Sequence, residues 1–163
     1  MAPVLVIAGT IVVLDQITKA VALAHLAPGV PIHVVDGLLA LTLVMNAGLA
    51  FGLLGGLPAA WRWMVAVLSL VALVVLARVA VRVLADGGRP ARLAVAFIFG
   101  GAVGNLIDRA RLGAVIDFVD VHYRGYHWPA FNVADSAITV GVVLLALRLL
   151  WSRPATESAG SRV

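Results

Sequence analysis

GGAVGNLIDRARLGAVIDFVDVHYRGYHWPAFNVAD is the sequence of residues 100–135, the stretch around which the chain is organised. It holds four of the chain's eight acidic residues, namely Asp108, Asp117, Asp120 and Asp135. Almost unbroken apolar sequence lies before it at 93–99 and after it at 136–151. Carboxylates beside apolar segments of membrane length are energetically costly, so they mark a candidate functional site.

The composition is that of an integral membrane protein. Hydrophobic residues make up 63% of the 163 residues, the mean hydropathy is +1.07, and charged residues make up only 12%, about half the usual globular share. We expect a single domain over residues 1–163. The absence of cysteine excludes disulfides and thiol catalysis. The net charge of +4 comes from scattered arginines, which disfavours nucleic acid as a partner.

Four apolar segments predict four transmembrane helices, at about 3–26, 61–77, 93–107 and 133–151. No basic residue precedes the first apolar run, so we interpret it as a retained span rather than a cleavable signal. Asp15 and Lys19 lie four residues apart, on one helical face, and can form an ion pair. The simplest interpretation is a structural pair in which Lys19 extends to the lipid headgroups.

Two connections differ in character from the spans. Residues 27–60 contain three prolines and two extended runs about Asp36 and Gly37, a pattern that predicts a β-hairpin. The polar residue Asn46 follows, and a buried asparagine needs a partner. Residues 110–131 form a second, polar and aromatic connection.

Arginines predict the orientation in the membrane. Four of them lie in 78–92, which we expect to be a cytoplasmic loop, and the polar tail 152–163 is also basic. The positive-inside rule then places both termini in the cytoplasm and the connections 27–60 and 110–131 outside. The carboxylates and asparagines therefore gather near the outer face of the membrane.

Two carboxylates suggest acid–base chemistry. Asp135 follows the potential N-cap Asn132 by three residues, and the plain interpretation is a capping acid favoured by the helix dipole. Asp117, however, stands between Val-Ile and Phe-Val pairs in the preceding connection. Two carboxylates in a site of low dielectric share a proton, so that one can act as general base and the other as general acid. Asp120 is a rival to Asp117 that these arguments leave open.

Other catalytic motifs are missing. The sequence has neither an HExxH zinc-protease motif nor a GxSxG nucleophile elbow. His122 and His127 are close in sequence, but two histidines without a clear third ligand are a weak indication of metal. We therefore expect no metal and no other cofactor.

Five motifs in order resemble the prolipoprotein signal peptidases, also called signal peptidase II. They are Asp15-Gln-Ile-Thr-Lys19, Asn46-Ala-Gly48-Leu-Ala50-Phe51, Gly100-Gly-Ala-Val-Gly104-Asn105-Leu-Ile-Asp108-Arg109, Val115-Ile-Asp117-Phe118 and Pro129-Ala-Phe131-Asn132-Val-Ala-Asp135-Ser136. No single motif is decisive, but together they cover nearly the whole chain from Asp15 to Trp151.

The resemblance implies an aspartic-type endopeptidase of the bacterial inner membrane. It would remove signal peptides from prolipoproteins by cutting before a cysteine that bears a diacylglyceryl group. The family's catalytic pair maps onto Asp117 and Asp135, against Asp120. The expected substrate-binding and site-supporting residues are Asp15, Lys19, Asn46, Gly48, Asn105, Asp108, Arg109 and Asn132.

The same resemblance implies further parts and partners. The connection 27–60 would form a small extracytoplasmic β-sheet, and the connection 110–131 would carry a short, flap-like extracytoplasmic helix. The partners would be lipid-modified prolipoproteins, membrane lipids and cyclic peptide antibiotics that block the site. Met45 and Leu49 depart from the family pattern at the rim of the site and bear on substrate preference and inhibitor fit.

Three rival functions remain to be weighed. A transporter or channel subunit would place polar residues at several depths, whereas here they gather toward one face. A non-catalytic assembly protein would leave the paired carboxylates unexplained. An intramembrane protease of the presenilin kind would need a GxGD motif, which the sequence lacks.

Overall fold

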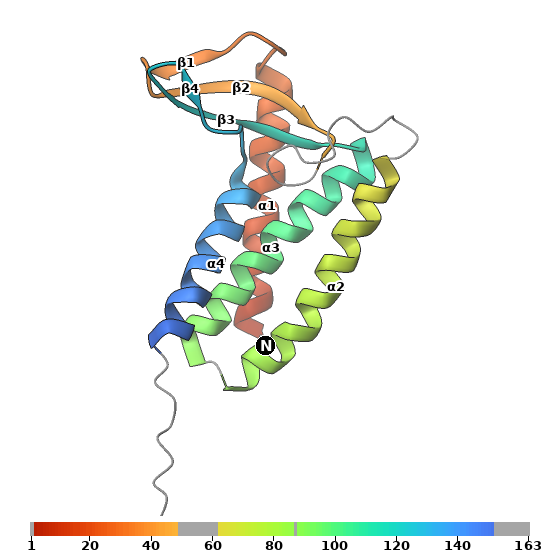
Figure 1. Cartoon of the computed structure of the whole chain (residues 1–163). Coiled ribbons are helices and arrows are strands. Elements are labelled where there is room, and N and C mark those ends of the chain that lie inside the picture. The colour runs from red at the N-terminus through yellow and green to blue at the C-terminus, as the bar shows by residue number, and fades with distance from the viewer. Residues whose placement is uncertain (1, 49–61, 87, 152–163) are drawn as a thin grey trace, which may run out of the picture.

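A computed structural model describes residues 2–48, 62–86 and 88–151 of the chain (Figure 1). The helices are α1 (Ala2–His25), α2 (Arg62–Asp86), α3 (Gly88–Leu112) and α4 (Val133–Trp151), and the strands are β1 (Ile32–Val35), β2 (Leu39–Asn46), β3 (Val115–Tyr123) and β4 (Tyr126–His127). The sheet lies at one end of the helices. The end of α2, the start of α3 and the end of α4 lie at the opposite end (Figure 1).

α3 is the central helix and contacts the other three. Glycines permit this close approach, because a Cβ atom would collide with the neighbouring helix. A Cβ on Gly100 would lie 2.8 Å from the carbonyl oxygen of Ala8 in α1, and one on Gly101 would overlap the carbonyl oxygen of Ala134 in α4. The glycines expected to allow tight helix packing therefore bring α1 and α4 onto α3.

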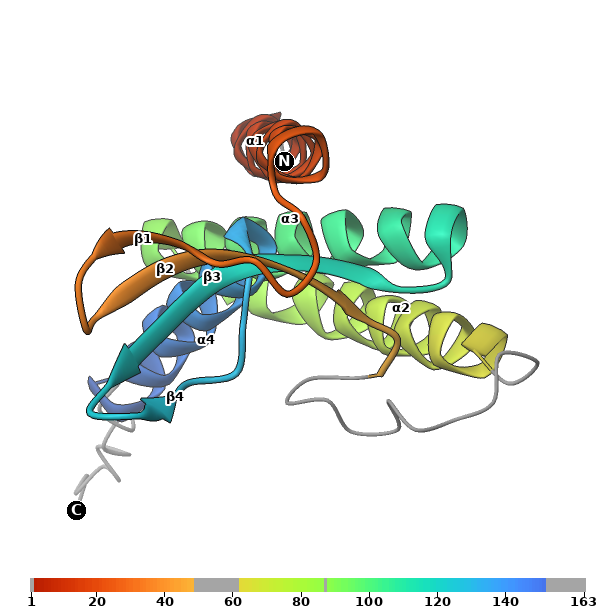
Figure 2. The ribbon, with the colours of Figure 1, turned by 90° about the horizontal axis from the view of Figure 1, so that it is seen from above.

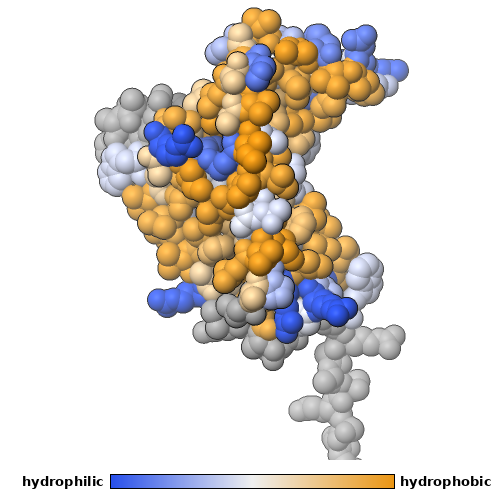
Figure 3. Space-filling view, turned by 180° about the vertical axis from the view of Figure 1, so that it is seen from behind, coloured by the Kyte–Doolittle hydropathy of each residue, from blue (hydrophilic) through white to orange (hydrophobic). Residues whose placement is uncertain are grey.

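The outer surfaces of the helices are apolar. Leucines and valines such as Leu5, Val71 and Val142 are about half exposed or more, and hydrophobic residues cover the helical part while hydrophilic ones gather toward its two ends (Figure 3). Within the described part of the chain, the helices long and apolar enough to cross a membrane are Ala2–His25, Trp63–Ala80 and Gly88–Leu112. A fourth span at α4 stays a prediction.

The strands form one antiparallel sheet in the order β1-β2-β3-β4. The predicted hairpin about Asp36 and Gly37 is confirmed, with Gly37 at a φ of 73° that suits glycine. β3 lies beside β2, so that Val44 is opposite Asp117 and Asn46 is opposite Val115. Seen from above, the strands cross the ends of the helices beside α1 (Figure 2).

The loop conformation expected over 78–92 is wrong, whereas the cytoplasmic side of this segment stays a prediction. α2 continues to Asp86, and α3 begins at Gly88. Residues 78–85 contain only alanine, valine, leucine and arginine, with no glycine or proline to end the helix. Pro90 is tolerated because it lies in the first turn of α3, where a backbone N–H has no intrahelical partner.

The expected flap-like helix over 110–131 is also wrong. α3 extends to Leu112, and β3 and β4 then occupy most of the connection. The segment Val115–Tyr123 is rich in β-branched and aromatic residues, which favour a strand. Pairing with β2 also satisfies its backbone polar groups.

Candidate active site

Asp117 lies on β3 and is only 2% exposed. Its two carboxylate oxygens accept hydrogen bonds from amides: Asn46 Nδ2 donates to Oδ2 at 3.0 Å and Asn132 Nδ2 donates to Oδ1 at 2.7 Å. Burial raises the pKa of Asp117 to about 6, and the nearby charge of Asp135 adds to this effect, whereas the two amide hydrogen bonds oppose it. Asp117 is therefore a carboxyl group that can hold a proton under mild conditions.

Asp135 lies in the first turn of α4, as the sequence predicts. Its backbone N–H donates to Asn132 Oδ1 at 2.9 Å, while the Asn132 N–H donates back to Asp135 Oδ2 at 3.2 Å. This reciprocal arrangement is a capping box, and it confirms Asn132 as the N-cap. Asn105 Nδ2 of α3 donates to the second oxygen, Oδ1, at 2.8 Å.

Two asparagines connect the carboxylates to each other. Asn132 bonds to both Asp117 and Asp135, and its Nδ2 also lies 3.2 Å from Asn105 Oδ1. Asn132 is fully buried and Asn105 is 7% exposed. Amides in such an apolar setting are stable only when they are hydrogen-bonded. Asn105 on α3 therefore holds Asp135, and Asn132, immediately before α4, holds both acids.

A buried cluster of three charged side chains, Asp15, Lys19 and Asp108, contacts this network through Asn105. Lys19 Nζ lies 2.8 Å from Asp15 Oδ2 and 2.7 Å from Asp108 Oδ2, and it donates to Asn105 Oδ1 at 2.9 Å. The predicted Asp15–Lys19 pair is confirmed. The expected extension of the Lys19 side chain to the lipid headgroups is wrong. The side chain is only 1% exposed, because a second carboxylate, that of Asp108, pairs with it inside the protein.

Backbone groups complete the environment of the cluster. Asp15 Oδ1 accepts from the Ala134 N–H at the start of α4 at 2.9 Å, which stabilises an otherwise unpaired helix terminus. Gln16 is a further member of the site, and its Nε2 donates to Asp108 Oδ1 at 2.9 Å. The sequence analysis did not include Gln16 among the site residues. Burying an unpaired amide in an apolar span costs free energy, so the position of Gln16 next to Asp15 already indicated that its side chain has a polar partner.

Arg109 fixes the end of β2 to α3. Its Nη2 donates to the carbonyl oxygen of Gly48 at 2.8 Å, and the Gly48 N–H donates to Asn46 Oδ1 at 3.0 Å. Asn46 is thereby held toward Asp117. The structure thus brings every residue predicted for the site into one connected network. Met45 lies outside this network on β2, half exposed, and Leu49 lies outside the described residues.

Asp120 is placed elsewhere. It lies further along β3, where its Oδ1 is within hydrogen-bond distance of His127 Nδ1, at 2.9 Å. Within the described part of the chain, it shares no hydrogen bond with the asparagines that connect Asp117 and Asp135. The geometry therefore favours Asp117 over Asp120 as the partner of Asp135.

An apolar cavity opens beside Asp135. Its volume is about 570 Å³, within the range of ligand sites. The residues that line it come from the β4–α4 connection and from one side of α4, and they are Trp128, Pro129, Ala130, Phe131, Asp135, Ser136, Ile138, Thr139 and Val140. Among these lining residues, Asp135 alone carries a carboxylate.

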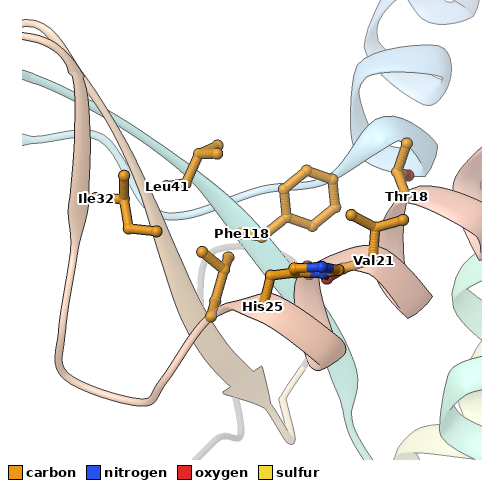
Figure 4. Close-up of a pocket in the computed structure, with 8 residues that line it drawn as sticks. Thr18, Val21, His25, Ile32, Leu41 and Phe118 are labelled. Atoms are coloured by element: carbon orange, nitrogen blue, oxygen red, sulfur yellow. The ribbon is translucent and has the colours of Figure 1, made fainter.

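A second cavity of about 290 Å³ lies between the last turns of α1 and the sheet (Figure 4). Val21 and His25 line it from α1, and Ile32, Leu41 and Phe118 line it from three strands. Phe118 neighbours Asp117 in sequence, so its side chain points to the opposite face of β3. This cavity does not include either of the two carboxylates.

The chain matches known proteins over nearly its whole length. The family model described as signal peptidase (SPase) II matches residues 7–151. Lipoprotein signal peptidases are 50% identical over 138 residues in Geobacter sulfurreducens, covering 85% of both chains, and 42% identical over 148 residues in Pseudomonas aeruginosa, covering 90% of this chain and 87% of the relative.

Solved structures agree with the sequence comparisons. A bacterial membrane enzyme determined by the in meso method superimposes with a TM-score of 0.75 at 30% identity, covering 100% of this chain and 94% of the other. A second structure with a similar description has the same TM-score and identity, covering 94% and 96%. With five motifs in order, a shared membrane-enzyme fold and one continuous match, the chain belongs to the signal peptidase II family.

Proposed function

We propose that this chain is an endopeptidase that removes signal peptides from bacterial prolipoproteins, cutting before a diacylglyceryl-modified cysteine with Asp117 and Asp135. The names of its relatives support the lipoprotein signal peptidase activity. The observation that carries the assignment to residues is the pair of carboxylates joined through Asn132. One of them lines an apolar cavity.

The chemistry follows from unequal environments. Asp135 lies at the N-terminus of α4, where the helix dipole and the hydrogen bonds from Asn105 and Asn132 favour its ionised form against the opposing effect of burial. Asp117 is buried on β3, which favours its protonated form. The ionised Asp135 takes a proton from water as the water oxygen attacks the scissile carbonyl. Asp117 donates its proton to the carbonyl oxygen and forms a neutral tetrahedral diol.

Collapse of the diol completes the reaction. The carboxyl group of Asp135, now protonated, gives its proton to the leaving amine, and Asp117 recovers a proton from a hydroxyl of the diol as the C–N bond breaks. The dyad returns to its starting state with one proton, and one water has been consumed. Asn105 and Asn132 hold the two acids in the geometry that this exchange needs.

The substrate approaches from the membrane. The lipid anchor holds the precursor in the outer leaflet, and the apolar walls of the 570 Å³ cavity receive the segment next to the scissile bond. This orientation places the sheet outside and the α2–α3 connection and both termini in the cytoplasm. Arg89 and Arg92 near that connection agree with the positive-inside rule. Cyclic peptide antibiotics would compete for the same cavity.

The test uses the purified full chain in lipid bilayers and a precursor peptide that carries a diacylglyceryl cysteine. Asp117→Asn and Asp135→Asn should each lower kcat by a factor of about 10²–10⁴, the usual contribution of an acid–base group. Asp36→Asn is the matched control, because it removes one carboxylate from an exposed turn. It should cleave at the wild-type rate.

Each failure has a distinct meaning. Near-wild-type cleavage by either dyad variant would reject the assignment of the carboxylates while leaving the activity in place. Intact precursor after incubation with folded wild-type protein would reject the peptidase function itself. An unlipidated precursor serves as a substrate control and should be cut far more slowly, because nothing anchors it at the outer leaflet.

A further inference from the structure

A cluster of two histidines and one aspartate lies on the β3–β4 hairpin, away from the two carboxylates of the proposed active site. His122 on β3 is the direct cross-strand partner of His127 on β4, and residues opposite each other in an antiparallel pair lie on the same face. Asp120 precedes His122 by two positions, so the period of a strand puts it on that face as well. The backbone alone therefore gathers the three side chains.

The turn between the strands fixes this register. Arg124 and Gly125 both have positive φ, 49° and 82°, as the two central residues of a tight type I′ hairpin turn require. A slip of one residue would move His127 to the other face of the sheet. The glycine thus secures the pairing of the two histidines.

The three side chains are spaced like ligands of one ion. One ligand atom from each lies within 4.8 Å of the others. Asp120 Oδ1 is 2.9 Å from His127 Nδ1 and 3.8 Å from His122 Nδ1. Around tetrahedral Zn²⁺, with bonds of about 2.1 Å, ligand atoms are about 3.4 Å apart. The observed separations lie on either side of that value, so small side-chain adjustments would suffice.

One nitrogen of the cluster lacks a hydrogen-bond partner. His122 Nδ1 is buried and has no such partner among the described residues, and the side chain as a whole is 11% exposed. Its ring stacks on that of His127, with the centroids 4.9 Å apart, and the His33 ring meets it edge-on at 6.0 Å. A simple hydrogen bond between His127 and Asp120 would leave this buried nitrogen unsatisfied, which is unfavourable.

We infer that Asp120, His122 and His127 bind a divalent transition-metal ion, with Zn²⁺ as the best fit. Two imidazoles and a carboxylate suit zinc, whereas calcium and magnesium prefer a shell of oxygens. The ion would accept the lone pair of His122 Nδ1, and water would fill a fourth position. Sequence reasoning set the two histidines aside for want of a third ligand, and the strand pairing now supplies Asp120.

Such an ion would cross-link the hairpin next to the proposed substrate cavity. The N–H of Trp128, the residue after His127, donates to the Val121 carbonyl oxygen at 2.8 Å, and Trp128 lines the 570 Å³ cavity. The metal would therefore stabilise one wall of that cavity. Its role is structural and separate from the proposed proton transfers.

The experiment measures metal binding directly, on the full chain in detergent with the purification tag removed. Titration calorimetry with Zn²⁺ should give one site per chain. Cobalt(II) should give the visible absorption of a tetrahedral complex. His122→Ala and Asp120→Asn should each weaken binding by more than the 10–100-fold that loss of an outer-shell partner typically costs. His25→Ala is the control, because this histidine lies on α1 and should bind as wild type does.

A third variant separates loss of a ligand from loss of fold. The chain has no cysteine, so His122→Cys would offer a single thiolate to the ion and should add a sulfur-to-cobalt charge-transfer band in the near ultraviolet. That band would show that position 122 ligates the metal. Absence of Zn²⁺ binding by the wild type, or equal binding by His122→Ala and wild type, would overturn the inference.

Discussion

Asp117 combines deep burial with two amide donors, and these act on its proton in opposite directions. Burial prevails, so the pKa lies at about 6, well above the unperturbed value of about 3.9. The protonated form therefore persists across the window from pH 4 to pH 6, where an exposed aspartate has already ionised. A carboxyl group with this property is suited to the acid role in a shared-proton pair.

The first prediction concerns the pH profile. If Asp117 is the general acid, kcat/KM should fall as the pH rises through about 6, because the proton that it donates is lost. The corresponding fall in kcat should occur at higher pH, because a bound substrate excludes water from the site and raises the pKa of Asp117 further. Initial rates from pH 4.5 to 8.5 would measure both limbs, with circular dichroism to verify the fold. A rate that rises through pH 6 would instead make Asp117 the base.

Lys19 leads to the second prediction, on stability. Lys19→Met keeps most of the side-chain volume but leaves the carboxylates of Asp15 and Asp108 buried side by side without their cation. Removing one partner of a buried ion pair costs about 3–5 kcal/mol. Thermal unfolding in detergent should show a much lower midpoint. Adding Asp108→Asn should recover part of the loss, and a double variant no more stable than the single one would contradict this account.

At the scale of elements, the glycines of α3 decide how closely the helices approach. Gly101→Ala is the third prediction: its Cβ would meet the backbone of Ala134 and the Ile138 side chain, which should move α4 away from α3. Overpacking typically costs about 1–3 kcal/mol, and the displaced Asp135 should lower activity as well. Gly9→Ala on α1 is the control, since a Cβ there has nothing within 4 Å. Unfolding midpoints and cleavage rates would compare the two.

Local spacing predicted those parts of the site that lie within one helix. Asn132 and Asp135 are three residues apart, and Asp15 and Lys19 are four apart, so helix geometry alone pairs them. Contacts between segments far apart in the sequence could not be predicted in this way. Only the register of β2 against β3 reveals that Asn46 donates to Asp117, and no periodicity within either segment encodes that register.

Element type was hardest to predict in the connection before α4. The resemblance suggested a helix there, and β3 formed instead, because its exposed backbone groups find partners on β2. The loop predicted after α2 failed for the opposite reason. Arginines indicated a soluble loop, but arginine is also a good helix former, so the charges did not end the helix.

At the scale of the whole molecule, hydrophobic residues cover the helices on the face that Figure 3 shows, and hydrophilic ones gather toward the two ends of the helical part. The orientation in the membrane can therefore be tested. As the fourth prediction, Tyr126→Cys on the exposed hairpin should react with a membrane-impermeant maleimide added outside right-side-out vesicles. Arg89→Cys at the start of α3 should react only after the vesicles are opened. The natural chain has no cysteine and so provides the blank. The reverse labelling pattern would invert the proposed topology.

The contact between Asp15 and the Ala134 N–H joins the beginning of the chain to its last helix. During synthesis, α1 would enter the bilayer long before Asp108, Asn132 or Ala134 exist. Its polar face can then be completed only when the final helix arrives. A nascent or truncated polypeptide without α4 would lack Asp135 and the Asn132 bridge, so under the proposed mechanism it would stay inactive until α4 is in place.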